Sequence, residues 1–156
     1  MRKLLTCLGL LATMGTAAGA QQAPPADQPT NVSDQVIQQV LEPLEAGIQG
    51  HNLQLTLSVF DSKELTGYSD FEGQLRAFFG QFDEIRFRYQ LLQVSADQDR
   101  ASAVAEMDMD AQPYDVTQPP VRRSVQMRLQ LKREAKGWKI VAFTPGDFFN
   151  VEYPPR

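Results

Sequence analysis

The spacing of apolar residues changes once along the chain, near residue 84. Before that point, from residue 33 onward, apolar side chains recur every three or four positions, which is typical of helices with one buried face. After it, up to residue 144, they recur at every second position, which is typical of strands. The pattern therefore predicts helices followed by a mainly antiparallel sheet in one α+β domain.

The first predicted helix has Ser33 or Asp34 as its N-cap and ends near Gly50. We expect Pro43 to kink it, because a proline inside a helix removes one backbone donor and its ring crowds the preceding turn. The next apolar run, residues 53–60, fits both a strand and a helix, and we interpret it as a helix.

An aromatic stripe marks the last helix before the sheet. Ser69 and Glu72 have the spacing of a capping box, which predicts that the helix begins there. The apolar residues of this helix share one face and predict a large apolar partner surface. They are Phe71, Leu75, Phe78, Phe79 and Phe82.

Four strands are predicted in the second half, over residues 85–94, 101–110, 125–132 and 138–144. Each has one apolar and one polar face, so we expect the apolar face to lie against the helices and the polar face to point away. The charges on the polar faces change sign from strand to strand, which favours antiparallel pairing of successive strands. These charges are Arg86 and Arg88, then Glu106, Asp108 and Asp110, then Arg128 and Lys132.

The first twenty residues predict export. Arg2 and Lys3 precede an apolar run over residues 4–14, and Ala18-Gly19-Ala20 supplies the small side chains that a signal peptidase requires. The run is too short for a permanent transmembrane helix, and no later segment is long and apolar enough. A lipobox ending at Cys7 is the alternative, but Cys7 precedes most of the apolar run. We therefore expect a signal peptide and a periplasmic or secreted protein that is not lipidated.

The remaining chain is expected to contain a proline-rich tether over residues 21–32, one domain over residues 33–149 and a C-terminal tail over residues 150–156. The signal carries two basic and no acidic residues, so its removal changes the formal net charge from −4 to −6. This acidity argues against a nucleic-acid partner. The only cysteine, Cys7, leaves with the signal, so we expect no disulfide and no cysteine-ligated metal. We also expect no other metal and no cofactor.

Several short motifs along the chain form a recognisable set: Gly50-His51-Asn52, Val59-Phe60-Asp61, Phe78-Phe79, Gly137-Trp138-Lys139-Ile140 and Pro145-Gly146-Asp147-Phe148-Phe149. They resemble motifs of nuclear transport factor 2-like (NTF2-like) domains, which share a cone shape with polyketide cyclase-like proteins. The resemblance covers roughly residues 33–149 and implies helices packed inside a curved sheet. It implies little about activity, because the family includes isomerases, dehydratases, epoxide hydrolases and transport factors.

Enzymes of this fold move protons inside the cone, which requires a carboxylate on the inward face. The predicted strands place none there, which leaves three weaker candidates. Asp61 follows the second helix and is the best candidate for a general base, although such residues more often cap local structure. Tyr89 could donate a hydrogen bond to an oxyanion. His51 directly follows Gly50, and we interpret it as a structural residue, with a pocket or switch role as the alternative.

Small and flexible side chains on the inward face suggest a pocket for an apolar ligand. The alternative is that the phenylalanines of the last helix fill this space. The expected lining residues are Tyr68, Phe79, Phe82, Phe87, Tyr89, Ala103, Ala105, Met107, Met127 and Leu129.

These observations favour an exported, non-enzymatic domain that binds a small apolar ligand or a protein partner, with a homodimer through the outer sheet face. A cyclase-like isomerase or hydrolase that uses Asp61 and Tyr89 is the main alternative. An envelope-associated structural protein is the second. The proline-rich loop over residues 112–120 is expected to expose Tyr114, and Trp138 is expected to lie in the core or in a dimer interface.

Overall fold

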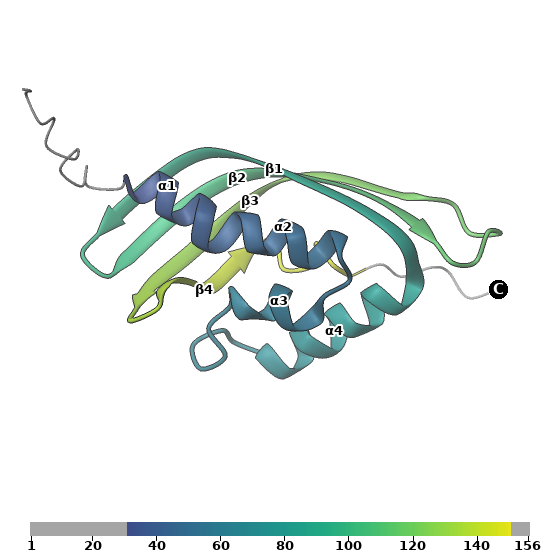
Figure 1. Ribbon diagram of the computed structural model, residues 1–156, viewed down its shortest axis with the longest axis horizontal. Coiled ribbons are helices and arrows are strands. Elements are labelled where there is room, and N and C mark those ends of the chain that lie inside the picture. Colours follow the sequence, from purple (N-terminus) through teal and green to yellow (C-terminus); the bar gives the residue numbers. More distant parts are fainter. Residues whose placement is uncertain (1–30, 151–156) are drawn as a thin grey trace, which may run out of the picture.

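The computed structural model describes residues 31–150 and confirms the α+β architecture (Figure 1). The predicted signal peptide, most of the tether and residues 151–156 of the tail lie outside the described residues. The elements are α1 (Val32–Val36), the π-helical turn η1 (Ile37–Leu41), α2 (Glu42–Gln49), α3 (Leu53–Ser58), α4 (Tyr68–Gln81), β1 (Phe82–Asp97), β2 (Arg100–Pro113), β3 (Val121–Glu134) and β4 (Gly137–Thr144).

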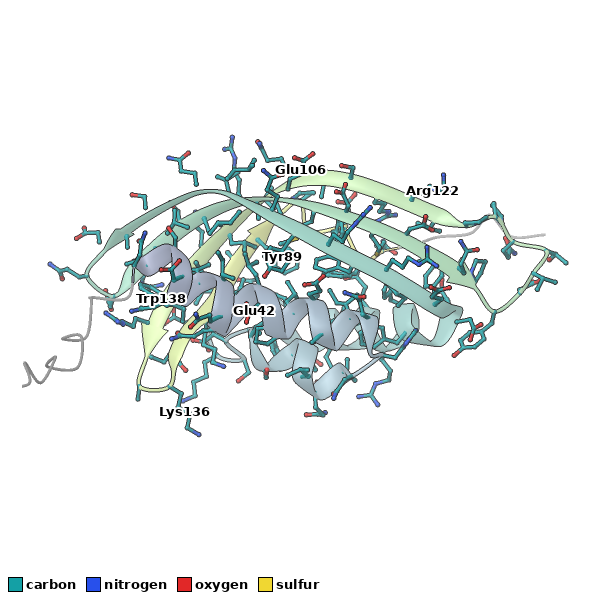
Figure 2. The ribbon with its side chains drawn as sticks, turned by 45° about the horizontal axis from the view of Figure 1, so that its top comes forward. Glu42, Tyr89, Glu106, Arg122, Lys136 and Trp138 are labelled. Atoms are coloured by element: carbon teal, nitrogen blue, oxygen red, sulfur yellow. The ribbon has the colours of Figure 1, made fainter. Side chains whose placement is uncertain are left out.

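The strands form one curved layer in the order β1-β2-β3-β4, and the helices form a second layer against its inner side (Figure 1). All neighbours in the sheet are antiparallel, which confirms the predicted sequential pairing. The predicted direction of the side chains is also confirmed. In β2 the inward alanines and methionines are at most 5% exposed, whereas Glu106 points away from the helices (Figure 2).

Charged residues lie opposite each other on the outer face of β1 and β2, as predicted. Arg86 lies opposite Asp110, and Arg88 lies opposite Asp108. Asp110 also lies opposite Arg122 of β3, whose Nε is 3.2 Å from its Oδ2. Of these cross-strand pairs within residues 31–150, only Asp110 and Arg122 approach closely enough to form an ion pair, and such an exposed pair contributes roughly 0.2–1 kcal/mol, so it favours the register without dominating stability.

The same prediction was wrong for Arg128 and Lys132 of β3. Arg128 lies opposite Val104, and Lys132 lies opposite Arg100. Lys132 and Arg100 instead share one partner in the loop before α4, because the Lys132 ammonium bonds Glu64 and the Arg100 Nη1 lies 3.0 Å from Glu64 Oε2. These contacts tie that loop to the end of the sheet.

The first helix differs from its prediction at two points. Its N-cap is Asn31, whose side-chain oxygen accepts a hydrogen bond from the Ser33 amide at 3.3 Å, rather than Ser33 or Asp34. The irregularity expected at Pro43 takes the form of the π-helical turn that directly precedes α2. A π-helical turn, whose hydrogen bonds span five residues, suits this position because proline has no backbone N–H to donate to the preceding turn.

The helical interpretation of residues 53–60 is confirmed for α3, whereas Phe60 lies beyond the helix and forms a β-bridge with Ile140. Asn52 caps α3 by accepting from the Leu55 amide at 3.0 Å. The capping box of α4 was wrong. Gly67, with φ of 72°, precedes the helix and makes no side-chain cap, so Ser69 lies inside the first turn. The helix also ends before Phe82, which begins β1 and is fully buried.

Trp138 is 1% exposed and lies in the core, which is one of the two locations expected for it (Figure 2). Its indole Nε1 donates to the side chain of Gln35 at 3.1 Å, and its amide donates to the side chain of Gln39 at the same distance. Tyr114 is exposed as expected, although β2 continues to Pro113 and so includes the start of the predicted loop.

Candidate functional site

His51 has a structural environment. It adopts a positive φ of 51° after α2, and its Nε2 lies 3.1 Å from the carbonyl oxygen of Phe82 and donates to it. Its ring packs edge-on against Phe79 with centroids 5.6 Å apart. These contacts join the end of α2 to the start of β1.

Asp61 is buried, and its carboxylate is engaged by the backbone. Its Oδ1 accepts from the Lys63 amide at 2.7 Å and from the Glu64 amide at 3.2 Å. The bond from Lys63, reinforced by that from Glu64, lowers the pKa of the Asp61 carboxyl against the opposing effect of burial. A general base at neutral pH needs a raised pKa, so this environment is that of a turn-capping residue.

The fold separates Asp61 from Tyr89. The Asp61 amide donates to the carbonyl of Ile140 at 2.9 Å, which places it beyond β4 at one edge of the sheet. Tyr89 lies on β1 at the other edge, with β2 and β3 between them. Burial raises the pKa of the Tyr89 phenol, and Glu42 and Glu45 add to this effect, so the group is a neutral donor at physiological pH.

We expect Asp61→Asn to weaken the dependence of the free energy of unfolding on pH in the acid range. The carboxyl has a lower pKa in the folded chain, so its ionised form stabilises the fold above its unfolded pKa of about 3.9, and this contribution disappears as the pH falls further. Urea unfolding between pH 7 and pH 2.5 should show the gap between wild type and variant closing below about pH 4. Asp34→Asn, an exposed acid in α1, is the control. A gap that does not change with pH would contradict this prediction.

The ten residues predicted to line a ligand pocket all lie in the core or against it. Eight are buried, while Tyr68 and Tyr89 are partly buried. Burial, with a smaller effect of Glu72, raises the pKa of the Tyr68 phenol. Their role in binding a ligand stays a prediction. The alternative was that phenylalanine rings fill the space between the helices and the sheet, and many such rings lie there.

Aromatic rings form a continuous network from α4 to β1. Phe78 contacts Phe82 with centroids 4.9 Å apart and Phe149 at 5.8 Å. Phe149 contacts Phe148 at 4.9 Å, and Phe148 contacts Phe87 of β1 at 6.1 Å. The rings therefore occupy much of the space in which the sequence predicted a pocket.

Arg123 holds the turn that carries two of these rings. Its Nη1 donates to the carbonyl oxygens of Asp147 and Phe148 at 2.7 and 2.6 Å, and its Nη2 donates to that of Asn150 at 2.6 Å. Sequence reasoning did not select Arg123, although it breaks the apolar alternation of β3 by placing a charge at an inward position. This break in the alternation is the feature of the sequence from which the role of Arg123 could have been inferred.

A cavity of about 400 Å³ lies beside this network, between α4 and β4, and we call it the α4–β4 cavity. Its apolar walls include Leu65, Phe71 and Phe143, and the rings of Phe71 and Phe143 have centroids 5.1 Å apart. Its other lining residues are Thr66, Gly67, Asp70, Gln74, Val141, Ala142 and Gly146. None of them was among the ten predicted lining residues.

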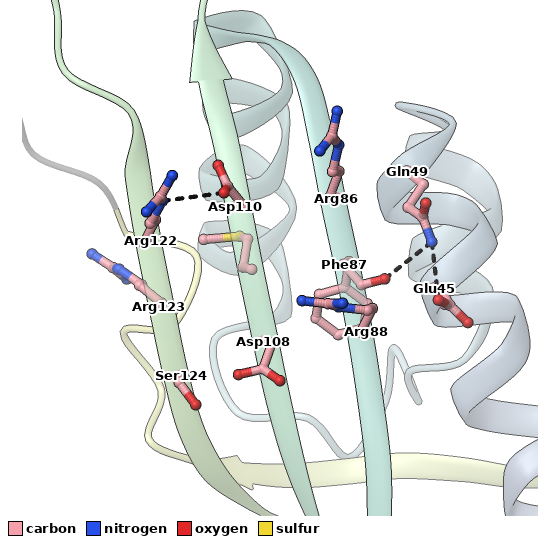
Figure 3. A pocket seen from close by; sticks show the side chains of 11 residues that line it. Glu45, Gln49, Arg86, Phe87, Arg88, Asp108, Asp110, Arg122, Arg123 and Ser124 are labelled. Carbon is pink, nitrogen blue, oxygen red and sulfur yellow. Dashed lines mark hydrogen bonds and ion pairs between the residues drawn. The ribbon is translucent and has the colours of Figure 1, made fainter.

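A larger and more polar hollow of about 710 Å³ lies at the outer face, over β1, β2 and β3 and beside α2 (Figure 3). Its lining includes Arg86, Arg88, Asp108 and Arg122. At its wall, Gln49 of α2 donates to the carbonyl oxygen of Phe87 at 3.0 Å and to a carboxylate oxygen of Glu45 at the same distance. The mixture of both charge signs suits a macromolecular surface better than a small apolar ligand.

Residues 31–150 contain no group of three or more His, Cys, Asp or Glu side chains placed to hold a metal ion. Within the same residues, no helix has the length and apolar character needed to cross a membrane.

No protein-family model and no curated protein matches the sequence. Solved structures do match. An NTF2-like superfamily protein from Salmonella enterica has a TM-score of 0.60 and 16% identity, over 71% of this chain and 89% of its own. The chain has the NTF2-like fold.

Other NTF2-like matches differ widely in sequence and in description. A conserved protein from Planctomyces limnophilus has a TM-score of 0.63 and 10% identity, covering 72% of this chain and 93% of its own. A hexachlorocyclohexane dehydrochlorinase has a TM-score of 0.55 and 12% identity, covering 80% and 94%. At such identities the likeness shows the NTF2-like fold alone.

Proposed function

We propose that the protein is an exported NTF2-like domain that acts by binding rather than by catalysis, and that the α4–β4 cavity takes a small apolar ligand. The observation that carries this proposal is the cavity itself, with its facing rings of Phe71 and Phe143. Its volume of about 400 Å³ falls within the roughly 300–1,000 Å³ of small-molecule sites. An apolar ligand gains free energy there by leaving water.

The environment of the candidate catalytic residues supports binding over catalysis. Asp61 gives its carboxylate to two backbone amides, and Tyr89 lies at the opposite edge of the sheet. A proton-transfer mechanism needs both groups within reach of one substrate. The isomerase or hydrolase that uses this pair is therefore the weaker alternative.

We expect the neutral dye Nile red to bind the wild-type chain with increased fluorescence. Gln74→Trp should weaken binding at least tenfold, because Gln74 lines the cavity and the larger side chain occupies it. Ala77→Trp adds the same ring to the same helix at an exposed position and should leave binding unchanged. Equal binding by the two variants, or no binding by the wild type, would refute the site.

We also propose that the mature chain begins at Gln21 and that two copies associate through the outer sheet face. Arg88 and Asp108 on that face make no ion pair with any described residue, which leaves both for a partner surface. Protein recovered from the cell envelope fraction should have the intact mass of residues 21–156 and the native mass of two chains. A full-length mass would contradict export, and a native mass of one chain would contradict the dimer.

A further inference from the structure

One edge of the sheet is only partly covered. β4 is the last strand, and Ile140 pairs on its outer side with Phe60 in a parallel bridge. The Ile140 amide donates to Val59 at 2.8 Å, and its carbonyl oxygen accepts from Asp61 at 2.9 Å. Beyond Ile140, residues 141–144 bond through their backbone to β3 alone within the described chain. An uncovered edge of this kind is a template for another strand.

A β-bulge at Val141 links this edge to the α4–β4 cavity. Ile140 lies opposite Leu131 and Ala142 lies opposite Gln130, so Val141 is one extra residue in β4. The extra residue shifts the alternation of side chains by one, and Phe143 therefore returns to the inner face and lines the cavity. The open backbone and the apolar cavity thus lie along the same stretch of β4.

The charge at the cavity favours a basic ligand. Asp70, in the first turn of α4, is the ionisable residue among those that line it, and it is exposed. A small neutral molecule would use the rings of Phe71 and Phe143 but neither the carboxylate nor the backbone edge. An extended chain with apolar side chains and one cationic group would use all three.

We propose that the natural ligand of the α4–β4 cavity is an extended peptide segment that adds a strand to the free edge of β4. Its backbone continues the parallel pairing begun by Phe60, its apolar side chains enter the cavity, and a lysine or arginine pairs with Asp70. This inference rests on the cavity of the proposed function and goes beyond it, because it makes a peptide, and not a small apolar molecule, the natural occupant. It names the class of partner that the cavity takes.

The test uses the full chain and a short fluorescein-labelled peptide of alternating valine and threonine with one lysine. We expect saturable binding by fluorescence anisotropy and slower hydrogen exchange at the amides of residues 141–144. The same peptide with N-methylated amides keeps its side chains but cannot donate to the edge, and it should bind at least tenfold more weakly.

Asp70→Asn should weaken binding of the lysine peptide about two- to fivefold, as expected for an exposed ion pair. It should not affect a peptide with norleucine in place of lysine. Asp34→Asn, which changes the matching acid in the first turn of α1, should affect neither.

Three results would overturn the peptide proposal. One is equal binding of the methylated peptide, and another is unchanged exchange at residues 141–144 on peptide addition. The third is slow hydrogen exchange at the amides of residues 141–144 in a two-chain species without peptide. That result would mean that a second copy of the chain covers the edge of β4. If Nile red still binds wild type and not Gln74→Trp, the small-ligand proposal survives these results. If neither probe binds, both proposals fail.

Discussion

Gly47→Ala is expected to destabilise the fold by about 3 kcal/mol, because α2 and α3 touch at this residue. A Cβ at Gly47 would lie 2.5 Å from Oγ1 of Thr56 and 2.7 Å from its backbone nitrogen. The Thr56 side chain is fully buried, and its hydroxyl donates to the carbonyl oxygen of Asn52 at 2.9 Å. Since backbone atoms cannot rotate away, the two helices must separate. Urea unfolding measures the loss.

Gly73→Ala is the matched control for this substitution. Gly73 lies inside α4, and a Cβ there would meet nothing within 4 Å. Alanine should therefore stabilise the chain by about 0.5–1 kcal/mol through its better helix propensity. If both substitutions had the same sign, steric contact at Gly47 would not be the cause.

Phe148→Ala is expected to cost about 3–5 kcal/mol, the usual range for removing a buried phenylalanine. The side chain is 1% exposed and joins Phe149 to Phe87 across the inside of the sheet. Thermal and urea unfolding should both report the loss. Val116→Ala, at a position that is 93% exposed, should change stability by less than about 0.5 kcal/mol.

The same variant tests whether the rings keep ligands out of the interior. Removal of Phe148 leaves an apolar space that a small aromatic such as benzene can enter, as engineered core cavities do. We expect benzene to raise the melting temperature of Phe148→Ala and not that of the wild type. An equal rise in both would indicate that the interior already contains an open site.

The sequence was sufficient for the strand order and for the direction of the β2 side chains. The alternation of alanine and methionine with acids in β2 allows one orientation only, because a shift by one residue would bury Glu106 and Asp108. Residues 53–60 fitted two periods. The helical state of residues 53–58 follows from the Asn52 cap and from the contact with α2, and that contact is not a local property.

The site was less predictable, because it depends on contacts between distant segments. The turn with Phe148 reaches the interior through Arg123, 25 residues earlier in the chain. The α4–β4 cavity depends on the bulge at Val141, which breaks the strict period of two that the sequence analysis assumed. The two backbone hydrogen bonds of Asp61 are local, and turn residues of this type have that preference, so this part of its environment is accessible from the sequence.

The π-helical turn η1 joins α1 to α2, and it sets the direction in which the side chains of α2 point relative to those of α1. Before it, Gln35 faces Trp138; after it, Gly47 faces Thr56. Each residue rotates a helix by about 100°, so deleting one residue between positions 37 and 41 would turn Gly47 away and bring a bulkier neighbour against α3. Homologous chains with a shorter helix should therefore carry their small residue at a shifted position, and helix length and glycine placement should evolve together.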